Sequence, residues 1–228
     1  MPRPTAATPP RPEPAAPSDP ARPPIQLPTQ AHGPADTDTL ETAAAAARRC
    51  TVCAPVLPLG PRPILQVGTG ARLLITSQAP GTKAHLSGIP FEDASGERLR
   101  DWLELDRATF YDTSKVAILP TGLCYPGRLP RGGDCPPRPE CAPIWHPRIL
   151  PLLREVRCRL LVGAYAQRLV LGPGPGLAER VRDFRRYLPT HFPLPHPSWR
   201  TLRWAAANPW FEAEVLPALR EVVRGVLR

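Results

Sequence analysis

Two short stretches of this chain carry residue types suited to binding a ligand and acting on it. The first, residues 73–81, reads Leu-Leu-Ile-Thr-Ser-Gln-Ala-Pro-Gly, an apolar buried strand that runs directly into a Pro-Gly turn. The second, residues 195–198, reads Pro-His-Pro-Ser and places the imidazole of His196 at the end of another strand-like run. Open α/β sheets bind ligands just beyond the carboxyl ends of their strands. We therefore expect both stretches to line one ligand site.

Cysteines form a second group of residues that can do chemistry. Cys50 and Cys53 are separated by two residues, and Cys124 and Cys141 lie in a long Gly/Pro-rich loop. Two-residue spacing lets both thiolates reach one centre, and four such sulfurs can hold an iron–sulfur cluster or a zinc ion. Six cysteines without a signal peptide favour metal binding or catalysis over disulfides. Such a centre would have a structural role, because it would tie an N-terminal helix to the loop.

The cysteine spacing leaves alternatives open. Cys135 lies in the same loop and competes with Cys141 as the fourth ligand, or the two form a pair. In the alternative interpretation, Cys50 and Cys53 form a CxxC by themselves, and the remaining cysteines take no part in a metal site. Cys158 begins a predicted buried strand, where we expect a small core hydrophobe.

Alternating strands and helices must position these residues. The predicted strands are short and apolar and span residues 72–77, 115–119, 158–163 and 190–194. The predicted helices span residues 39–49, a segment capped by Ser95, residues 147–156, 164–171 and 177–187, and a C-terminal segment that opens at Asn208-Pro209. Strands that alternate with helices predict a mostly parallel sheet covered on both faces. We predict an α/β fold, a three-layer sandwich around a four-stranded sheet in a single domain.

Composition separates a tail from the folded part. Residues 1–40 hold 12 of the 35 prolines and no aromatic side chain, which predicts a disordered tail followed by one domain over residues 41–228. Residues 1–47 carry three arginines and five acidic residues, so the net charge of +9 comes from the remainder. A basic globular surface suits a polyanion such as nucleic acid. We expect neither secretion nor a membrane span, because no apolar segment has the required length.

Four motifs stand out in this chain: Ser-Gln-Ala-Pro-Gly at 77–81, Gly-Ile-Pro-Phe at 88–91, a CxxC with two distant cysteines, and His-Pro-Ser at 196–198. Their order resembles that of the uracil-DNA glycosylase superfamily. The likeness is closest to the iron–sulfur branch of that superfamily and covers residues 46–228. It implies a 4Fe–4S cluster, with zinc as the alternative, on the ligands Cys50, Cys53, Cys124 and Cys141.

The resemblance also implies a pocket for a base flipped out of DNA. The turn formed by Gln78, Ala79, Pro80 and Gly81 would place backbone N–H groups around the base and its deoxyribose, with Gln78 among the catalytic residues. Phe91 would stack on the base. A flipped base needs such contacts, because its removal from the duplex costs about a few kcal/mol.

The second motif would supply the chemistry and grip the DNA. His196 would donate to O2 of the base as the N-glycosidic bond breaks, which stabilises the negative charge that builds on the leaving base. Ser198 would help to bind a phosphate. Trp199, Arg200 and Leu202 lie where the superfamily has a loop that enters the DNA, and the arginines that follow would grip the backbone.

Two positions depart from the pattern of the best-studied branch. Where that branch has an aspartate that orients water, this chain has Ala79, and we take Asp93 as the replacement, although a loop or helix-capping role suits Asp93 equally. Where members that read uracil have an asparagine, residues 117–122 read Ala-Ile-Leu-Pro-Thr-Gly. Thr121 offers a hydroxyl there, but not a paired donor and acceptor, so strict uracil recognition is not predicted.

These observations predict a DNA repair glycosylase that flips a damaged base, uracil or another deaminated base, and hydrolyses its N-glycosidic bond. The alternative is a non-catalytic nucleic-acid-binding protein that keeps the fold and the cluster. Ala79 and Pro120 favour that alternative, whereas Phe91 and His196 oppose it. A third hypothesis is activity on another damaged base, or on single-stranded DNA or RNA. The expected protein is a monomer that acts on DNA in the cytoplasm, at the bacterial nucleoid.

Overall fold

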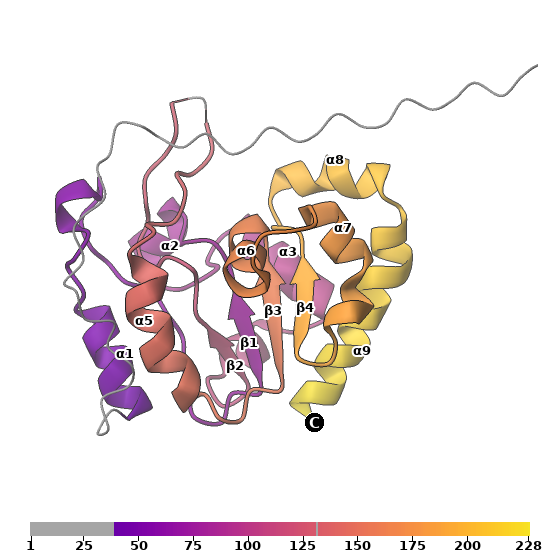
Figure 1. The fold of residues 1–228 in the computed structure, drawn as a ribbon, viewed down its shortest axis with the longest axis horizontal. Helices are drawn as coiled ribbons and strands as arrows, with labels where there is room; N and C mark the ends of the chain where they lie inside the picture. Colours follow the sequence, from indigo (N-terminus) through magenta and orange to yellow (C-terminus); the bar gives the residue numbers. More distant parts are fainter. Residues whose placement is uncertain (1–38, 131) are drawn as a thin grey trace, which may run out of the picture.

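A single sheet forms the centre of the molecule, for which a computed structural model describes residues 39–130 and 132–228 (Figure 1). Its strands are β1 (Leu73–Thr76), β2 (Val116–Ile118), β3 (Cys158–Val162) and β4 (His191–Leu194). Their order is β2-β1-β3-β4, and all three pairings are parallel. The predicted four-stranded, mostly parallel sheet is therefore confirmed. The tail predicted for residues 1–40 lies, up to residue 38, outside the described residues.

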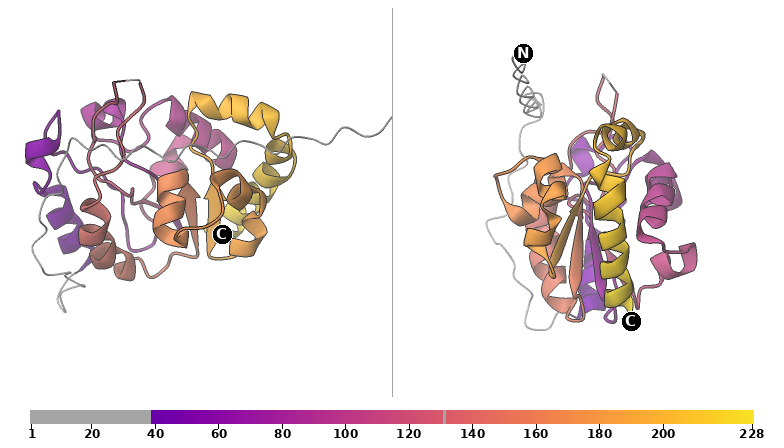
Figure 2. Two further views of the ribbon diagram at one scale, coloured as in Figure 1. Left: turned by 45° about the horizontal axis from the view of Figure 1, so that its top comes forward. Right: turned by 90° about the vertical axis from the view of Figure 1, so that its right-hand side faces the viewer.

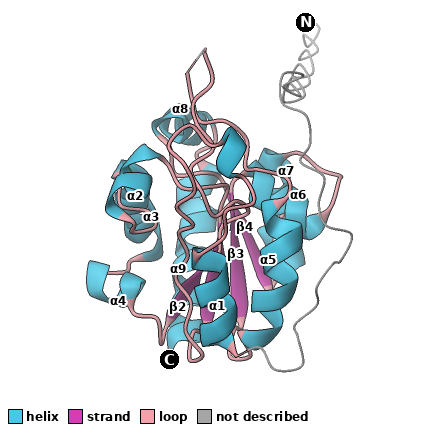
Figure 3. Cartoon of the chain, turned by 90° about the vertical axis from the view of Figure 1, so that its left-hand side faces the viewer, coloured by secondary structure: helices cyan, strands magenta, loops and turns pink. Residues whose placement is uncertain are grey.

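Helices connect the strands and cover both faces of the sheet. The α-helices are α1 (Leu40–Arg48), α2 (Thr82–Ser87), α3 (Ala94–Leu103), α4 (Arg107–Tyr111), α5 (Cys141–Ile149), α6 (Ala164–Leu171), α7 (Leu177–Arg182), α8 (Trp199–Ala207) and α9 (Leu216–Leu227). Shorter 3₁₀ turns span Ala54–Val56, Leu150–Leu152 and Phe184–Tyr187, and a π-helical turn, Phe211–Val215, leads into α9. Figure 2 shows the sheet edge-on between α9 and the orange helices, and Figure 3 shows α3 on one side of the strands with α5 and α6 on the other. This is the predicted three-layer arrangement.

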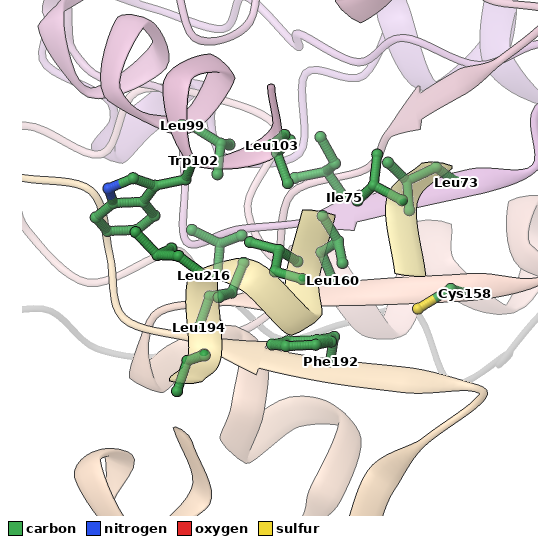
Figure 4. Packing of buried hydrophobic residues seen from close by; sticks show 14 of the residues in the cluster. Leu73, Ile75, Leu99, Trp102, Leu103, Cys158, Leu160, Phe192, Leu194 and Leu216 are labelled. Atoms are coloured by element: carbon green, nitrogen blue, oxygen red, sulfur yellow. The ribbon is translucent and has the colours of Figure 1, made fainter. Parts of the chain in front are cut away.

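Two apolar clusters, one on each face of the sheet, hold the layers together. Leu73 and Ile75 of β1 are fully buried against α3 and α9, whereas Leu74 between them points to the other face and packs with α1 and α5. Figure 4 shows the first cluster, in which Leu99 and Leu103 of α3 face the strands. Alternate side chains of a strand point to opposite faces, so a strand that is apolar throughout requires cover on both sides.

Three predicted elements begin at different residues in the structure. Helix α3 is capped by Asp93, which precedes it, and not by Ser95. The helix predicted over residues 147–156 is α5, which begins earlier, at Cys141, and ends at Ile149, before a 3₁₀ turn. It can begin at Cys141 because Pro143 lies in its first turn, where a missing N–H removes no helical hydrogen bond. The predicted C-terminal helix begins not at Asn208-Pro209 but at Leu216, as α9, after the separate helix α8 and the π-helical turn. Among the described residues, no helix is long and apolar enough to span a lipid bilayer.

Candidate active site

A cavity of about 640 Å³, hereafter the large cavity, opens at the carboxyl ends of the strands. Ser77 directly follows β1, Pro120 lies two residues after β2, and His196 lies two residues after β4. In Figure 1 the arrows point toward this end of the sheet, where α8 lies. The other lining residues come from the turn after β1, the start of α3, the loop after β2 and the start of α8: Gln78, Ala79, Pro80, Gly81, Ala84, Pro90, Phe91, Asp93, Ser95, Arg128, Leu129, Gly132, Gly133, Asp134, Ser198, Trp199 and Arg200. Both stretches singled out in the sequence therefore line one site.

The turn after β1 is held in place by the segment after β2. The backbone N–H groups of Thr121 and Gly122 donate to the carbonyls of Ser77 and Gln78, each over 2.8 Å. The Thr121 hydroxyl donates to the same Ser77 carbonyl, also over 2.8 Å. Thr121 does not appear among the described residues that line the large cavity. The structure thus places Thr121 behind the turn, whereas the whole predicted turn, Gln78 to Gly81, faces the cavity.

Phe91 is fixed in the cavity wall by an unusual backbone. Its φ angle is +57°, in the left-handed region that non-glycine residues rarely adopt. Gly96 makes this possible, because a Cβ there would lie 1.8 Å from the Phe91 carbonyl oxygen. The rings of Phe91 and Phe110 form a T-shaped pair with centroids 6.1 Å apart, and Phe91 lines the large cavity. Strained backbone of this kind, which costs about 1–3 kcal/mol, is concentrated at functional sites.

Asp93 both caps a helix and lines the large cavity. Its Oδ1 accepts a 2.8 Å hydrogen bond from the N–H of Gly96 and caps α3. Its Oδ2 lies 3.7 Å from the point where a Cβ of Gly81 would stand, and Gly81 lines the large cavity. The same carboxylate therefore caps a helix and faces the cavity.

Asp134 is a second cavity carboxylate, to which sequence reasoning assigned no role. Its Oδ2 also lies 3.7 Å from the Cβ position of Gly81. Burial raises the pKa of Asp134, the charge of Arg128 opposes this shift, and the charge of Asp93 adds to it. The only sequence signal was an acidic residue directly after Gly132 and Gly133, in a loop considered for its cysteines alone.

His196 is held at the cavity by backbone contacts on several sides. The Thr201 hydroxyl and the N–H of Ser198 donate to its carbonyl, and the guanidinium of Arg98 donates to the next carbonyl, that of Pro197, over 2.7 Å. The side chain packs on Gly163, where an added Cβ would lie 3.3 Å from the His196 Cβ. Burial lowers the pKa of His196, while the Asp93 carboxylate acts in the opposite direction. The imidazole is therefore largely neutral at pH 7 and can donate from one ring N–H.

This geometry agrees with a comparison against known protein families. The model of the Uracil DNA glycosylase superfamily matches residues 66–220. The chain belongs to the uracil DNA glycosylase superfamily. The matched range includes all four strands and every described residue that lines the large cavity. Membership of this superfamily implies DNA glycosylase activity in general and DNA as the partner.

In this superfamily member the segment after the His-Pro-Ser motif is helical and not a loop. Trp199, Arg200 and Leu202 all lie on α8, whose first residue follows Ser198. Trp199 and Leu202 are 65% and 56% exposed, which is unusual for large apolar side chains. The Arg200 guanidinium lies 5.2 Å from the centroid of the Trp199 ring. Trp199 and Arg200 border the large cavity directly, whereas Leu202 lies one turn further along the helix.

In the stretch 117–122, where members that read uracil have an asparagine, Pro120 lines the large cavity, and a buried polar network lies behind it. Nε2 of His146 donates to the Pro120 carbonyl over 2.9 Å, which leaves Nδ1 to accept from Arg159 over 3.3 Å. The Arg159 Nε in turn donates to the hydroxyl of Thr76 over 2.8 Å. Burial lowers the pKa of His146 to about 4, so the ring is neutral, as these two bonds require. Sequence reasoning assigned no role to His146, because the partner carbonyl is distant in the chain.

The four predicted metal ligands of this glycosylase-family chain surround a second, small cavity, hereafter the cysteine cavity. Cys50, Cys53, Cys124 and Cys141 all line it, together with apolar side chains. The N–H of Leu123 donates to the Cys141 sulfur over 3.2 Å. Cys135 does not appear among the described residues that line this cavity, and Cys158 is fully buried in β3. Cys50 and Cys53 lie outside the range matched by the family model.

Several features of the cysteine cavity bear on what could fill it. Trp145 lines the cavity, and its indole N–H is buried without a hydrogen-bond partner among the described residues. Arg138 also lines it and forms a largely buried ion pair with Glu140, N to O 2.6 Å. Burial raises the pKa of Cys124 to about 11 and that of Cys141 to about 12, so a bound metal must displace their protons. In the described part of the chain, no three histidine, cysteine or acidic side chains come close enough to hold a single metal ion.

Proposed function

We propose that this protein is a DNA glycosylase that flips a damaged base, uracil or another deaminated base, and hydrolyses its N-glycosidic bond. The observation that carries the proposal is the joint presence of His196, Phe91 and Asp93 in one cavity at the carboxyl edge of the sheet. These three supply a donor for the leaving base, an aromatic face and a carboxylate for water. A protein that only binds DNA has no need of this combination.

His196 would act on the leaving base. As the bond from C1′ to the base breaks, the electron pair moves to the base, and a fixed N–H donor stabilises that charge more in the transition state than in the ground state. The lowered pKa of His196 favours a neutral donor, so the base would leave as an anion held by a hydrogen bond. The close packing of His196 on Gly163 supports a fixed ring position.

Asp93 would replace the aspartate that is missing at Ala79. One of its oxygens is committed to the cap of α3, which leaves the other oxygen to accept from a water molecule near Gly81. A carboxylate fixed by a helix cap is already oriented before substrate binds, so little ordering is needed during the reaction.

Base selection would rely on groups other than an asparagine. The Pro120 carbonyl already accepts from His146, and Thr121 already donates to Ser77. Gln78 lines the cavity, and its side-chain amide offers both a donor and an acceptor to a base edge. We propose that Gln78 and the neighbouring backbone read the base, with a broader selectivity than strict uracil recognition.

Basic and apolar groups beside the cavity would hold the DNA. Arg200 and Ser198 lie where they can reach a phosphate, and the exposed Trp199 and Leu202 can fill the space that the flipped base leaves. The overall charge of +9 favours such binding.

For the cysteine cavity we propose a structural 4Fe–4S cluster. Cys50, Cys53, Cys124 and Cys141 line one cavity, as the ligands of a shared centre must, and four thiolates suit either a zinc ion or an iron–sulfur cluster. The resemblance to the iron–sulfur branch of the superfamily favours the cluster over zinc. The Leu123 N–H bond to Cys141, the unpartnered indole N–H of Trp145 and the nearby Arg138 are suited to sulfur atoms and negative charge. When bound, the cluster would fix the chain around α1 to the loop after β2.

The test is base release from labelled oligonucleotides that contain one uracil, hypoxanthine, xanthine or thymine mismatch, in single and double strands, with anaerobically purified protein. Release from any of them establishes the glycosylase and defines its base. Binding to all of them without release would instead support a non-catalytic DNA-binding protein.

The role of His196 has its own test. We expect His196→Ala to lower single-turnover base release by about 100-fold or more while the Kd for DNA changes little, because a transition-state donor is lost. His191→Ala, on the same strand segment but not at the cavity, is the matched control and should retain activity. Equal rates for His196→Ala and the wild-type protein would remove His196 from the mechanism.

A further inference from the structure

Two carboxylates lie close to Gly81 in the large cavity. The Oδ2 atoms of Asp93 and Asp134 each lie 3.7 Å from the same point, the Cβ position that Gly81 lacks. All three residues line the cavity. A side chain at position 81 would therefore contact both carboxylates, whereas glycine leaves them free of such a contact.

The two carboxylates are fixed by unrelated parts of the chain. Asp93 is held by the cap of α3, through Gly96. Asp134 is held by a narrow loop after β2, in which residues 128 and 134 form an antiparallel bridge and the N–H of Cys135 donates to the Gly127 carbonyl over 2.8 Å. Their proximity therefore exists only in the folded molecule and is established before any ligand binds.

The surrounding charges distinguish Asp134 from an ordinary surface carboxylate. Arg128 and Arg200 are close enough to act on it, and Arg200 lies across Gly133, 3.3 Å from the Cβ position of that glycine. Neither arginine forms an ion pair with Asp134 within 4.0 Å in the described residues. Asp134 lines the large cavity, so its carboxylate lies beside the space that a ligand would enter.

We infer that Asp134 is a second catalytic carboxylate of this site, which together with Asp93 holds the attacking water in front of Gly81. The inference rests on the proposed glycosylase function. Asp93 accepts one hydrogen bond from the water and orients its lone pair toward C1′. As the water oxygen bonds to C1′, the C1′–N bond breaks, and its electron pair goes to the base. The water proton passes to Asp134, which afterwards releases it to solvent, and the base anion takes up a proton from solvent.

The first experiment measures single-turnover base release and the Kd for DNA on the best oligonucleotide from the panel. We expect Asp134→Asn and Asp93→Asn each to lower the rate by about 100-fold, within the range for loss of a general base, with Kd nearly unchanged. The double variant should be little slower than either single variant, because both residues act on one water. Asp101→Asn, on the exposed face of α3, is the matched control and should retain the wild-type rate.

Two further measurements separate catalysis from a structural role. Sodium formate should restore part of the rate of Asp134→Ala, because a small carboxylate can occupy the vacated space, whereas sodium chloride at the same ionic strength should not. Gly81→Ala is compatible with the backbone φ of −82° and would place a methyl group 3.7 Å from Oδ2 of each carboxylate. We expect it to lower release while DNA binding is kept.

The outcomes distinguish the two proposals. If the wild-type protein releases a base and Asp134→Asn is equally fast, the catalytic role inferred for Asp134 is wrong. The proposed glycosylase function is then still supported. If Asp134→Asn weakens DNA binding as much as release, Asp134 is a binding residue, and the inference is again overturned. If the wild-type protein releases no base from any lesion, both proposals fall.

Discussion

The large cavity and the cysteine cavity lie on either side of the segment that follows β2, yet they are built from different chemistry. Titratable side chains from distant segments, including His196, Asp93 and Asp134, line the large cavity. Sulfur and apolar side chains line the cysteine cavity, with Arg138 as a charged member. Gly122 lies between the two, because a Cβ there would meet Pro137 at 3.1 Å and Ala79 at 3.5 Å.

This difference indicates that the segment after β2 can contribute residues to the large cavity and also be held in place by the cysteine cavity. A cavity that must admit a base and water cannot be filled by packing, so its walls need support from elsewhere. The loop that carries Asp134 begins at the cysteine cavity with Cys124 and returns to it with Cys141. We interpret the cysteine cavity as the anchor for one wall of the large cavity. Variants at each cavity show whether the large cavity depends on the cysteine cavity for its structure.

We expect the largest loss of stability and activity when a cysteine of the cysteine cavity is replaced. The proposed 4Fe–4S cluster would give the protein bound iron and a broad absorbance at roughly 400 nm, and Cys141→Ser should abolish both. It should also lower the Tm by roughly 10 °C or more, because metal binding contributes directly to folding free energy. Base release should fall with it, since the loop that carries Asp134 loses its attachment.

Cys135→Ser is the matched control for that change, because Cys135 lies in the same loop but not at the cysteine cavity. We expect Cys135→Ser to have the same iron content and the same Tm as the wild-type protein. Loss of iron in Cys135→Ser, with retention in Cys141→Ser, would reverse the ligand assignment. A colourless wild-type protein that contains zinc would overturn the iron assignment.

A second prediction concerns the wall of the large cavity alone. Gly96→Ala would place a methyl group 1.8 Å from the Phe91 carbonyl oxygen, so the backbone of Phe91 or the start of α3 must move. We expect a destabilisation of at least about 3 kcal/mol and loss of base release, with iron content unchanged. Urea unfolding and the oligonucleotide assay measure the two effects. Gly225→Ala, in α9 with no atoms near its Cβ position, should instead stabilise the protein by about 0.5–1 kcal/mol.

A third prediction concerns pH and the network behind Pro120. Burial lowers the pKa of His146 from 6.5 to about 4, so between these values the unfolded chain binds a proton that the folded protein does not. The free energy of unfolding should therefore be highest above pH 6.5 and fall by up to about 3 kcal/mol as the pH decreases to 4. His146→Gln can still donate to Pro120 and accept from Arg159, but it does not titrate. Unfolding curves at several pH values should show a smaller pH dependence for this variant, and an unchanged dependence would contradict the assignment.

The smallest effect is expected at the rim, outside both cavities. Leu202→Ala removes an exposed side chain from α8, so we expect no change in Tm and a loss of at most roughly tenfold in kcat/KM, from poorer stabilisation of the opened DNA. Leu169→Ala, which changes a 43% exposed leucine on α6, serves as the control and should leave kcat/KM unchanged. Identical kinetics for the two variants would show that Leu202 does not contact the DNA.

Sequence reasoning was accurate where the signal is local. The strands were predicted to within a residue or two at most ends, because each is a short apolar run bounded by polar or glycine residues. The turn from Gln78 to Gly81 and the position of His196 followed from their places after strands. Helix starts near prolines were less accurate, as at α5, because proline suits both a loop and a first helical turn.

Sequence reasoning failed for partners that are distant in the chain. His85 closely follows the turn at residues 78–81 in the chain, where a solvated loop histidine and a member of the pocket are both reasonable hypotheses. In the structure it lies on α2, is 7% exposed and packs near Tyr125 with ring centroids 6.0 Å apart, and it is not among the described residues that line the large cavity. His146 and Asp134 were given no role, because their partners follow only from how the loop after β2 folds. No local pattern distinguishes a loop aspartate in solvent from one beside another carboxylate.

The sequence by itself determined the parallel sheet, the two stretches at its carboxyl edge and the superfamily. All three follow from the periodicity of the strands and the order of the motifs, which depend only on the order of residues in the chain. Only the tertiary structure decided that Asp93 and Asp134 face one space, that Cys141 and not Cys135 reaches the cysteine cavity, and that Thr121 supports the turn from behind. The physical reason is that these relations depend on how long loops return to the sheet. Loop paths are set by packing against other segments, and residue types alone do not encode them.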